Sequence, residues 1–252
     1  MKKRMSTIAL QGCALLTLLG TMVPAMAQDA AAPYPIMAPL EQYLMDRDAE
    51  IALARSAAPE SISRHAGVLV LGRQGYETAV AGRNGWVCMV ERGWLGMFDH
   101  PEFWSPKVRA ADCLNPPAAR SLLPYVHKRT ELLLAGRSKV EVIAAIQAAI
   151  DQRALPALEP GALSYMMSKA SYLTDHGHHN LPHLMFFETR LDDAAWGANL
   201  PHSPVLSVPY WYLSGEAFPQ LATFPPLFVF LVAVDKWSDG TPAPVIPATP
   251  AM

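Results

Sequence analysis

Short runs of alternating or apolar residues, separated by turn residues, give the clearest β pattern in this chain. Three such runs cover residues 67–72, 76–81 and 85–92. Gly72-Arg73-Gln74-Gly75 separates the first two runs, and Gly82-Arg83-Asn84-Gly85 leads into the third. Asn-Gly is typical of tight turns because both residues tolerate positive φ. The pattern therefore predicts an antiparallel β-meander.

Apolar residues recur at helical spacing on both sides of this β region. Residues 40–54 predict an amphipathic helix that ends near Pro59. Asn115-Pro116 is a typical helix start, since Asn caps the first amides and Pro suits the first turn. Ser138 and Glu141 form a capping box ahead of a further apolar stripe. The region after the meander is therefore predicted to be helical.

Sheet-like apolar runs return after Pro160, over residues 162–167, 184–187 and 227–234. Strands and helices that are segregated along a chain favour an α+β fold with an antiparallel sheet. We expect a single domain of this class over residues 40–237. A leader rich in Pro and Ala precedes it over residues 28–39. A Pro-rich C-terminal tail follows over residues 238–252 and is expected to run along the surface.

Residues 1–27 have the layout of a secretory signal peptide. Lys2, Lys3 and Arg4 precede an apolar run over residues 8–23, and Pro24-Ala25-Met26-Ala27 supplies a small-x-small cleavage site. This run is too short and wrongly flanked for a stable membrane span. We therefore expect cleavage after Ala27 and a periplasmic or secreted protein. A weaker alternative is a lipid anchor at Cys13.

The charge pattern argues against nucleic acid as a partner. Cleavage would remove three positive charges and change the formal net charge from −2 to about −5. Lys and Arg are scattered along the chain, whereas nucleic-acid binders gather them into a basic face.

Two cysteines, Cys88 and Cys113, remain after cleavage and can form one intramolecular disulfide in an oxidising compartment. Closing a loop of about 26 residues would stabilise the fold by about 3 kcal/mol. Cys88 shares a strand face with Trp86 and Val90, while Val87, Met89 and Glu91 share the other. The alternative is a pair of buried free thiols.

A cluster of histidines is the strongest candidate for chemistry. Four lie within eight positions, next to Asp175: His176, His178, His179 and His183. Imidazole is the commonest side-chain ligand of transition metals such as Zn and Cu, and Asp175 adds an oxygen donor. The cluster allows three interpretations, which are a transition-metal site, a metal-free pocket around His183, and a polar loop without a ligand.

Other polar residues fall at the ends of predicted strands. Glu91 and Arg92 end the third β run, and Asp239 follows the last apolar strand. Together with His183 they could line a ligand site at one rim of the sheet, although Ser-Asp-Gly is also ordinary turn chemistry. Ser164 and Ser168 lie outside any known nucleophile motif, and the chain has no phosphate loop or dinucleotide fingerprint.

Several segments resemble a group of exported bacterial proteins of unknown function. The likeness spans roughly residues 41–240 and rests on five stretches, at residues 84–92, 163–168, 182–187, 196–199 and 237–240. It implies bacterial export and a single domain, and it directs attention to His183. It implies no catalytic residue or cofactor.

The sequence thus favours an exported α+β protein that binds a small molecule or a transition metal near His183. One alternative is an exported metal-dependent hydrolase, which would need three protein ligands and an open water position. A second alternative is an envelope or assembly protein that has no site and uses an apolar face for contacts.

Overall fold

The computed structural model describes residues 33–176, 181–210 and 214–244. These residues form one α+β domain built on an eight-stranded, mostly antiparallel sheet, which confirms the predicted fold class. The proposed signal peptide and the end of the C-terminal tail lie outside the described residues.

The elements have the following bounds. The α-helices are α1 (Arg47–Arg55), α2 (Glu60–Ser63), α3 (Pro116–Leu134), α4 (Lys139–Asp151) and α5 (Asp193–Trp196). Short 3-10 turns are η1 (Leu40–Gln42), η2 (Gly93–Leu95) and η4 (Pro219–Thr223). The strands are β1 (Gly67–Gly72), β2 (Gly75–Val80), β3 (Val87–Glu91), β4 (Ala110–Leu114), β5 (Leu163–Met166), β6 (His183–Glu188), β7 (Val205–Pro209) and β8 (Phe228–Ala233).

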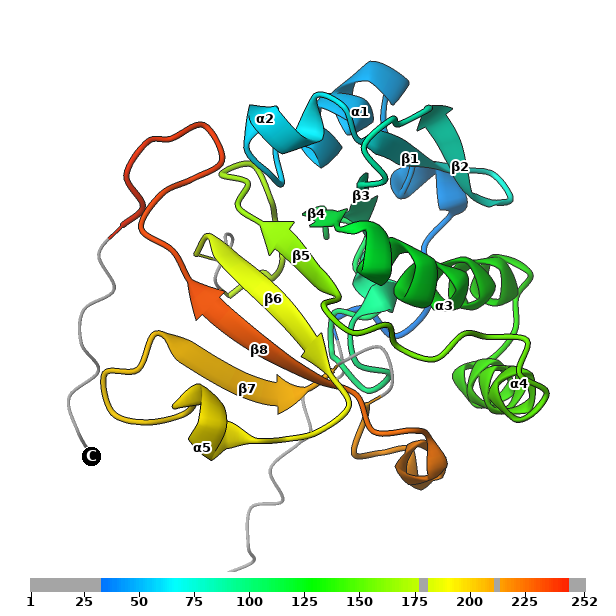
Figure 1. Cartoon of the computed structure of the whole chain (residues 1–252). Coiled ribbons are helices and arrows are strands. Elements are labelled where there is room, and N and C mark those ends of the chain that lie inside the picture. The colour runs from blue at the N-terminus through cyan, green and yellow to red at the C-terminus, as the bar shows by residue number, and fades with distance from the viewer. Residues whose placement is uncertain (1–32, 177–180, 211–213, 245–252) are drawn as a thin grey trace, which may run out of the picture. The chain divides into compact units, whose positions relative to one another are not determined.

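The sheet has the strand order β2-β1-β3-β4-β5-β6-β8-β7 (Figure 1). β1 pairs with β2 in antiparallel fashion but with β3 in parallel, so the predicted meander is wrong. After β2 the chain crosses the start of β1 and returns on its other side. Gly82 allows this crossing, because a Cβ there would lie 2.1 Å from the backbone nitrogen of Gly67.

Asn84 shows why the expected hairpin turn does not form. Its side-chain amide donates to the carbonyl of Ile62 at 2.8 Å, and its oxygen accepts from the amide of Trp86 at 3.1 Å. These bonds tie the crossing segment to α2. Asn-Gly therefore anchors a crossover here and does not reverse a hairpin.

The helix starts follow local capping chemistry. Asn115 accepts from the amide of Ala118 at 2.9 Å, and Ser138 with Glu141 forms the expected capping box, so both predicted starts are confirmed. The helix predicted over residues 40–54 is wrong at its start. Asp46 caps α1 by accepting from the amide of Ala49, so the earlier residues form only the η1 turn.

The later strands β5, β6 and β8 agree with the predicted runs, whereas β4 and β7 were not predicted. β4 lies between β3 and β5, in the middle of the sheet. The sequence predicted no element for the segment between β3 and α3, which contains β4.

One face of the central strands packs tightly against α1. Alanines of α1 and of the turn after it meet Cys88, Val90, Ala111 and Cys113 there. Cys88 and Cys113 lie opposite each other on β3 and β4 and form the predicted disulfide, with an S–S distance of 2.05 Å. The predicted alternation along β3 is also confirmed, since Met89 and Val87 contact the core on the other face.

The opposite face carries the larger core, which is covered by α3 and α4. Met89, Leu114, Met166 and Met185 contribute to it from four neighbouring strands. Within the described part of the chain, no helix is long and apolar enough to cross a membrane.

Candidate functional site

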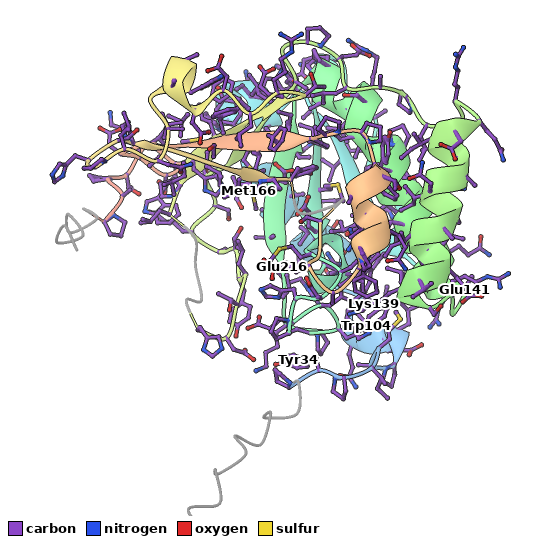
Figure 2. The ribbon with its side chains drawn as sticks, turned by 90° about the horizontal axis from the view of Figure 1, so that it is seen from below. Tyr34, Trp104, Lys139, Glu141, Met166 and Glu216 are labelled. Carbon is purple, nitrogen blue, oxygen red and sulfur yellow. A yellow bond between two sulfur atoms is a disulfide. The ribbon has the colours of Figure 1, made fainter. Side chains whose placement is uncertain are left out.

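A cavity of about 400 Å³ lies at one rim of the sheet, on the α3 face. It forms where β3 and β5 end and where β4 and β6 begin, and Leu231 of β8 closes one side. Most of its lining is apolar, and Met166 at the end of β5, labelled in Figure 2, belongs to this part. The polar residues on its wall are Glu91, Arg92, His100, Glu102, Thr174 and His183.

The connection between β3 and β4, residues 92–109, covers this cavity and is fastened from outside. Its carbonyl groups at three positions accept hydrogen bonds. Tyr43 donates to Trp104 at 2.6 Å, the guanidinium of Arg129 donates to Gly96 at 2.6 Å, and the ammonium of Lys139 donates to Phe98 at 2.5 Å. Trp104 and Lys139 are labelled in Figure 2. Long connections in compact domains are usually functional, and this one holds a preformed cavity.

Arg92 borders the cavity, but its guanidinium points into the α1 side of the fold. It is fully buried and pairs with the carboxylate of Glu50 at 2.8 Å. It also donates to the carbonyl groups of Tyr43 at 2.9 Å and Val90 at 2.5 Å. The charge of Arg92 is therefore balanced by Glu50, and its placement fits a structural ion pair between α1 and the end of β3.

Glu91 and Asp112 are two buried carboxyl groups on the cavity side of neighbouring strands. Glu91 lines the cavity and lies opposite Ala110, while Asp112 lies opposite Met89. The two acids are thus diagonal neighbours on one face of the sheet, a separation that long side chains can span.

The environment of Asp112 is unusual for an acid. The residue is 1% exposed, and neither carboxyl oxygen has a hydrogen-bond partner of normal geometry in the described part of the chain. Burial raises the pKa of Asp112 to about 7, and the nearby hydroxyl of Ser164 and amide of Cys113 oppose this rise only in part. A perturbed acid beside a cavity is a typical feature of functional sites.

Glu102 is the most informative residue of the cavity wall. It is 3% exposed, and its Oε1 accepts from the hydroxyl of Thr174 at 2.8 Å and from the amide of Asp175 at 3.0 Å. Its other oxygen, Oε2, is buried and has no hydrogen-bond partner within the described part of the chain. Nδ1 of His100 accepts from the amide of Glu102 at 3.1 Å and helps fix this position. Buried polar atoms are nearly always satisfied, so this carboxyl oxygen is the polar atom of the wall with the most capacity for a further hydrogen bond.

His183 begins β6 and stands on the same wall. Its Nδ1 lies 2.7 Å from the carbonyl of Leu181, and burial lowers its pKa, while this hydrogen bond opposes the shift. A hydrogen bond from Nδ1–H to the carbonyl leaves Nε2 as the basic nitrogen of a neutral ring. His183 is the first residue of β6 and directly follows Pro182.

The structure describes only part of the histidine cluster that was predicted to bind a metal. His178 and His179 lie outside the described residues, and His176 is exposed at the end of its loop. Among the residues that the structure does describe, no three His, Cys, Asp or Glu side chains are placed to hold a metal ion. A Zn or Cu site formed by the whole cluster therefore stays a prediction.

Asp175, expected as an oxygen donor or partner of the histidines, is engaged elsewhere. It accepts from Tyr34 at 2.7 Å, from Lys107 at 3.0 Å and from Tyr172. These donors hold the pKa of Asp175 well below its usual range. The residue thus fastens the segment around Tyr34 to the loop beside the cavity.

Asp239 does not line the cavity. It accepts from Lys169 at 2.8 Å and, within its own turn, from the hydroxyl of Thr241 at 2.6 Å. These contacts correspond to the turn chemistry that the sequence offered as the alternative. Of the four predicted ligand-binding residues, the fold brings Glu91, Arg92 and His183 to one cavity and places Asp239 in a separate turn.

Sequence reasoning missed Glu102 and Asp112. Glu102 belongs to no motif, and its position depends on how residues 92–109 fold over the sheet. Asp112 could have been found only if β4 had been predicted. The disulfide offers that signal, since a cysteine paired with Cys88 of β3 is well placed on a neighbouring strand.

The chain matches no protein-family model, no curated protein and no solved structure.

Proposed function

We propose that this chain is an exported protein that binds a small, largely apolar organic molecule in the cavity beneath residues 92–109. The observation that carries the proposal is Glu102, a buried acid on the wall of a preformed cavity, whose Oε2 has no partner among the residues that the structure describes. Ligand sites typically combine an apolar lining with a few convergent polar groups that fix orientation. Glu91, Glu102 and His183 supply such groups here, from three separate segments of the chain.

Export is supported by two independent features. Residues 1–27 have the composition of a cleavable signal peptide. The Cys88–Cys113 disulfide is typical of proteins that fold outside the reducing cytosol. The resemblance to exported bacterial proteins agrees with both, and we place the protein in the periplasm or the medium.

Native mass spectrometry of the protein purified from its own host tests this proposal. We expect a small organic molecule to copurify with the wild-type protein. Leu173→Trp places a large ring on the cavity wall and should abolish this copurification.

Ala157→Trp serves as the matched control. Ala157 lines a different cavity, of about 450 Å³, beside α3, α4 and Pro225. This variant should retain the molecule. If both variants retain it, or if both lose it while remaining folded, the molecule does not occupy the cavity beneath residues 92–109 and the proposal is wrong.

A further inference from the structure

The cavity beneath residues 92–109 carries two carboxyl groups, one guanidinium group and two imidazole rings on its described wall. Glu91 and Glu102 stand on its wall, and Asp112 lies beside Glu91 on the same sheet face. Arg92 is the one Lys or Arg side chain on the described wall, and Glu50 already balances its charge. Burial also lowers the pKa of His183, which favours its neutral form.

The apolar part of the lining is suited to a hydrocarbon body. Met97, Met166, Leu173 and Leu231 contribute flexible or branched side chains from four different segments. Methionine adapts well to irregular apolar ligands. A ligand that fills this space would therefore combine an apolar body with one polar end near Glu102.

From these two features we infer that the ligand is an organic cation, with an ammonium group that donates to Oε2 of Glu102 and an apolar body that packs against the methionine-lined wall. This inference rests on the proposed function and specifies the ligand class. An ammonium carries three donors and a positive charge, so it satisfies a buried carboxylate in both respects.

Other ligand classes fit the wall less well. An anion has no proton to donate to Oε2 of Glu102 and would be repelled by a carboxylate there. A neutral molecule offers weaker hydrogen bonds to the buried carboxyl group of Glu102 than a charged donor does. A bare metal ion needs several converging ligands, and the described residues do not bring three together.

Three probes of matched shape test the inference in isothermal titration calorimetry with the full chain. They are 2-phenylethylammonium chloride, neutral 2-phenylethanol and anionic 3-phenylpropanoate. We expect the ammonium to bind at least tenfold more tightly than the alcohol, and the carboxylate to bind most weakly. This comparison uses only the wild-type protein, so it holds even if a variant fails to fold.

Glu102→Gln assigns the effect to one residue. It keeps the side-chain shape and removes the charge, so it should abolish the preference for the ammonium while leaving binding of the alcohol within about threefold. Glu131→Gln removes the same charge from an exposed position on α3 and should leave the preference unchanged. Circular dichroism confirms that each variant is folded.

The outcomes separate the inference from the proposed function. If the alcohol or the carboxylate binds as tightly as the ammonium in the wild-type protein, the cavity binds ligands but the cationic class is wrong. If Glu102→Gln keeps the full preference, the assignment to Glu102 is wrong. If none of the three probes binds and no small molecule copurifies from the host, both the inference and the proposed function fail.

Discussion

The two faces of β3 and β4 differ in how their buried polar groups are paired. On the α1 face, these strands place the disulfide, Val90 and Ala111 against the alanines of α1, and the buried charges of Glu50 and Arg92 neutralise each other. On the α3 face, the same strands place Glu91 on the wall of a cavity and Asp112 diagonally next to it, and Asp112 has no hydrogen-bond partner of normal geometry among the described residues.

This difference arises from simple alternation, because neighbouring residues of a strand point to opposite faces. Two adjacent strands can therefore stabilise the fold on one side and carry destabilising polar groups on the other. Natural proteins usually break the rules of good packing at functional sites. The comparison teaches that the α1 face supports the fold. A function is to be sought at the rim of the α3 face where the cavity lies, which we call the α3 rim.

The largest expected effect comes from breaking the ion pair on the α1 face. Arg92→Met leaves the buried carboxylate of Glu50 without its cation and should lower the free energy of unfolding by about 3–5 kcal/mol. Urea denaturation measures this change. Arg47→Met is the matched control, because Arg47 pairs with Glu77 at an exposed site and its loss should cost less than about 1 kcal/mol.

The double variant Glu50→Met with Arg92→Met sharpens this test. Removing both charges avoids an uncompensated buried ion, so much of the lost stability should return. If Arg92→Met costs no more than Arg47→Met, the pair does not hold the α1 face together as described.

The next effect concerns Asp112 and depends on pH. The pKa of Asp112 is about 7 in the folded protein, above the value of about 3.9 expected in the unfolded chain. Between these two pKa values the carboxyl group of Asp112 is protonated in the folded protein and ionised in the unfolded chain. The free energy of unfolding therefore falls as pH rises from about 4 to about 7. The loss is at most on the order of 4 kcal/mol, and it stays constant above this window.

Asp112→Asn removes the titrating group and should flatten this part of the stability profile. Unfolding free energies measured for both proteins at intervals from pH 5 to pH 8 give the difference directly. Asp175 does not contribute to the slope in this pH range. Because its pKa is lowered in the folded protein, the stability that it provides is lost only in more acidic solutions. If the variant keeps the slope of the wild-type protein, Asp112 is ionised throughout and the description of the α3 rim is wrong.

The α1 face was largely predictable from the sequence, and the α3 rim was not. Alternation along residues 86–91 predicted the two faces of β3, and the expectation of an oxidising compartment predicted the pairing of Cys88 with Cys113. β4 escaped prediction because Ala110-Ala111-Asp112-Cys113-Leu114 has little intrinsic strand preference. Its conformation depends on pairing with β3 and β5, which are distant in sequence.

The candidate site shows the same limit. Glu91, Arg92 and His183 could be found because they stand at the ends of recognisable strands. Glu102 could not, since its position is set by the anchoring of residues 92–109 through Tyr43, Arg129 and Lys139. The expected meander failed for a related reason, because the close contact of Gly82 with Gly67 is a tertiary feature that turn propensities do not encode.

A smaller effect is expected from removing the disulfide. Replacing Cys88 and Cys113 together by Ala frees a loop of about 26 residues in the unfolded chain and should lower the free energy of unfolding by about 3 kcal/mol. Because both cysteines face α1, ligand binding at the α3 rim should be unchanged in the folded variant. Equal stability of the variant and the wild-type protein, or loss of binding without loss of structure, would contradict the division between the two faces.

The smallest effects come from two buried serines that differ in their partners. Ser171 accepts from the buried amide of Ala111 at 3.0 Å, so Ser171→Ala strands that amide and should cost about 1–3 kcal/mol. Ser164 lies on the α3 face, and its hydroxyl has no partner of normal geometry among the residues that the structure describes. Ser164→Ala should therefore change stability by less than about 1 kcal/mol, while raising the pKa of Asp112 further. Urea denaturation measures the loss of unfolding free energy for both substitutions. If the two losses are equal, the polar groups of the α3 rim are as well satisfied as Ser171, and the contrast between the two faces is not supported.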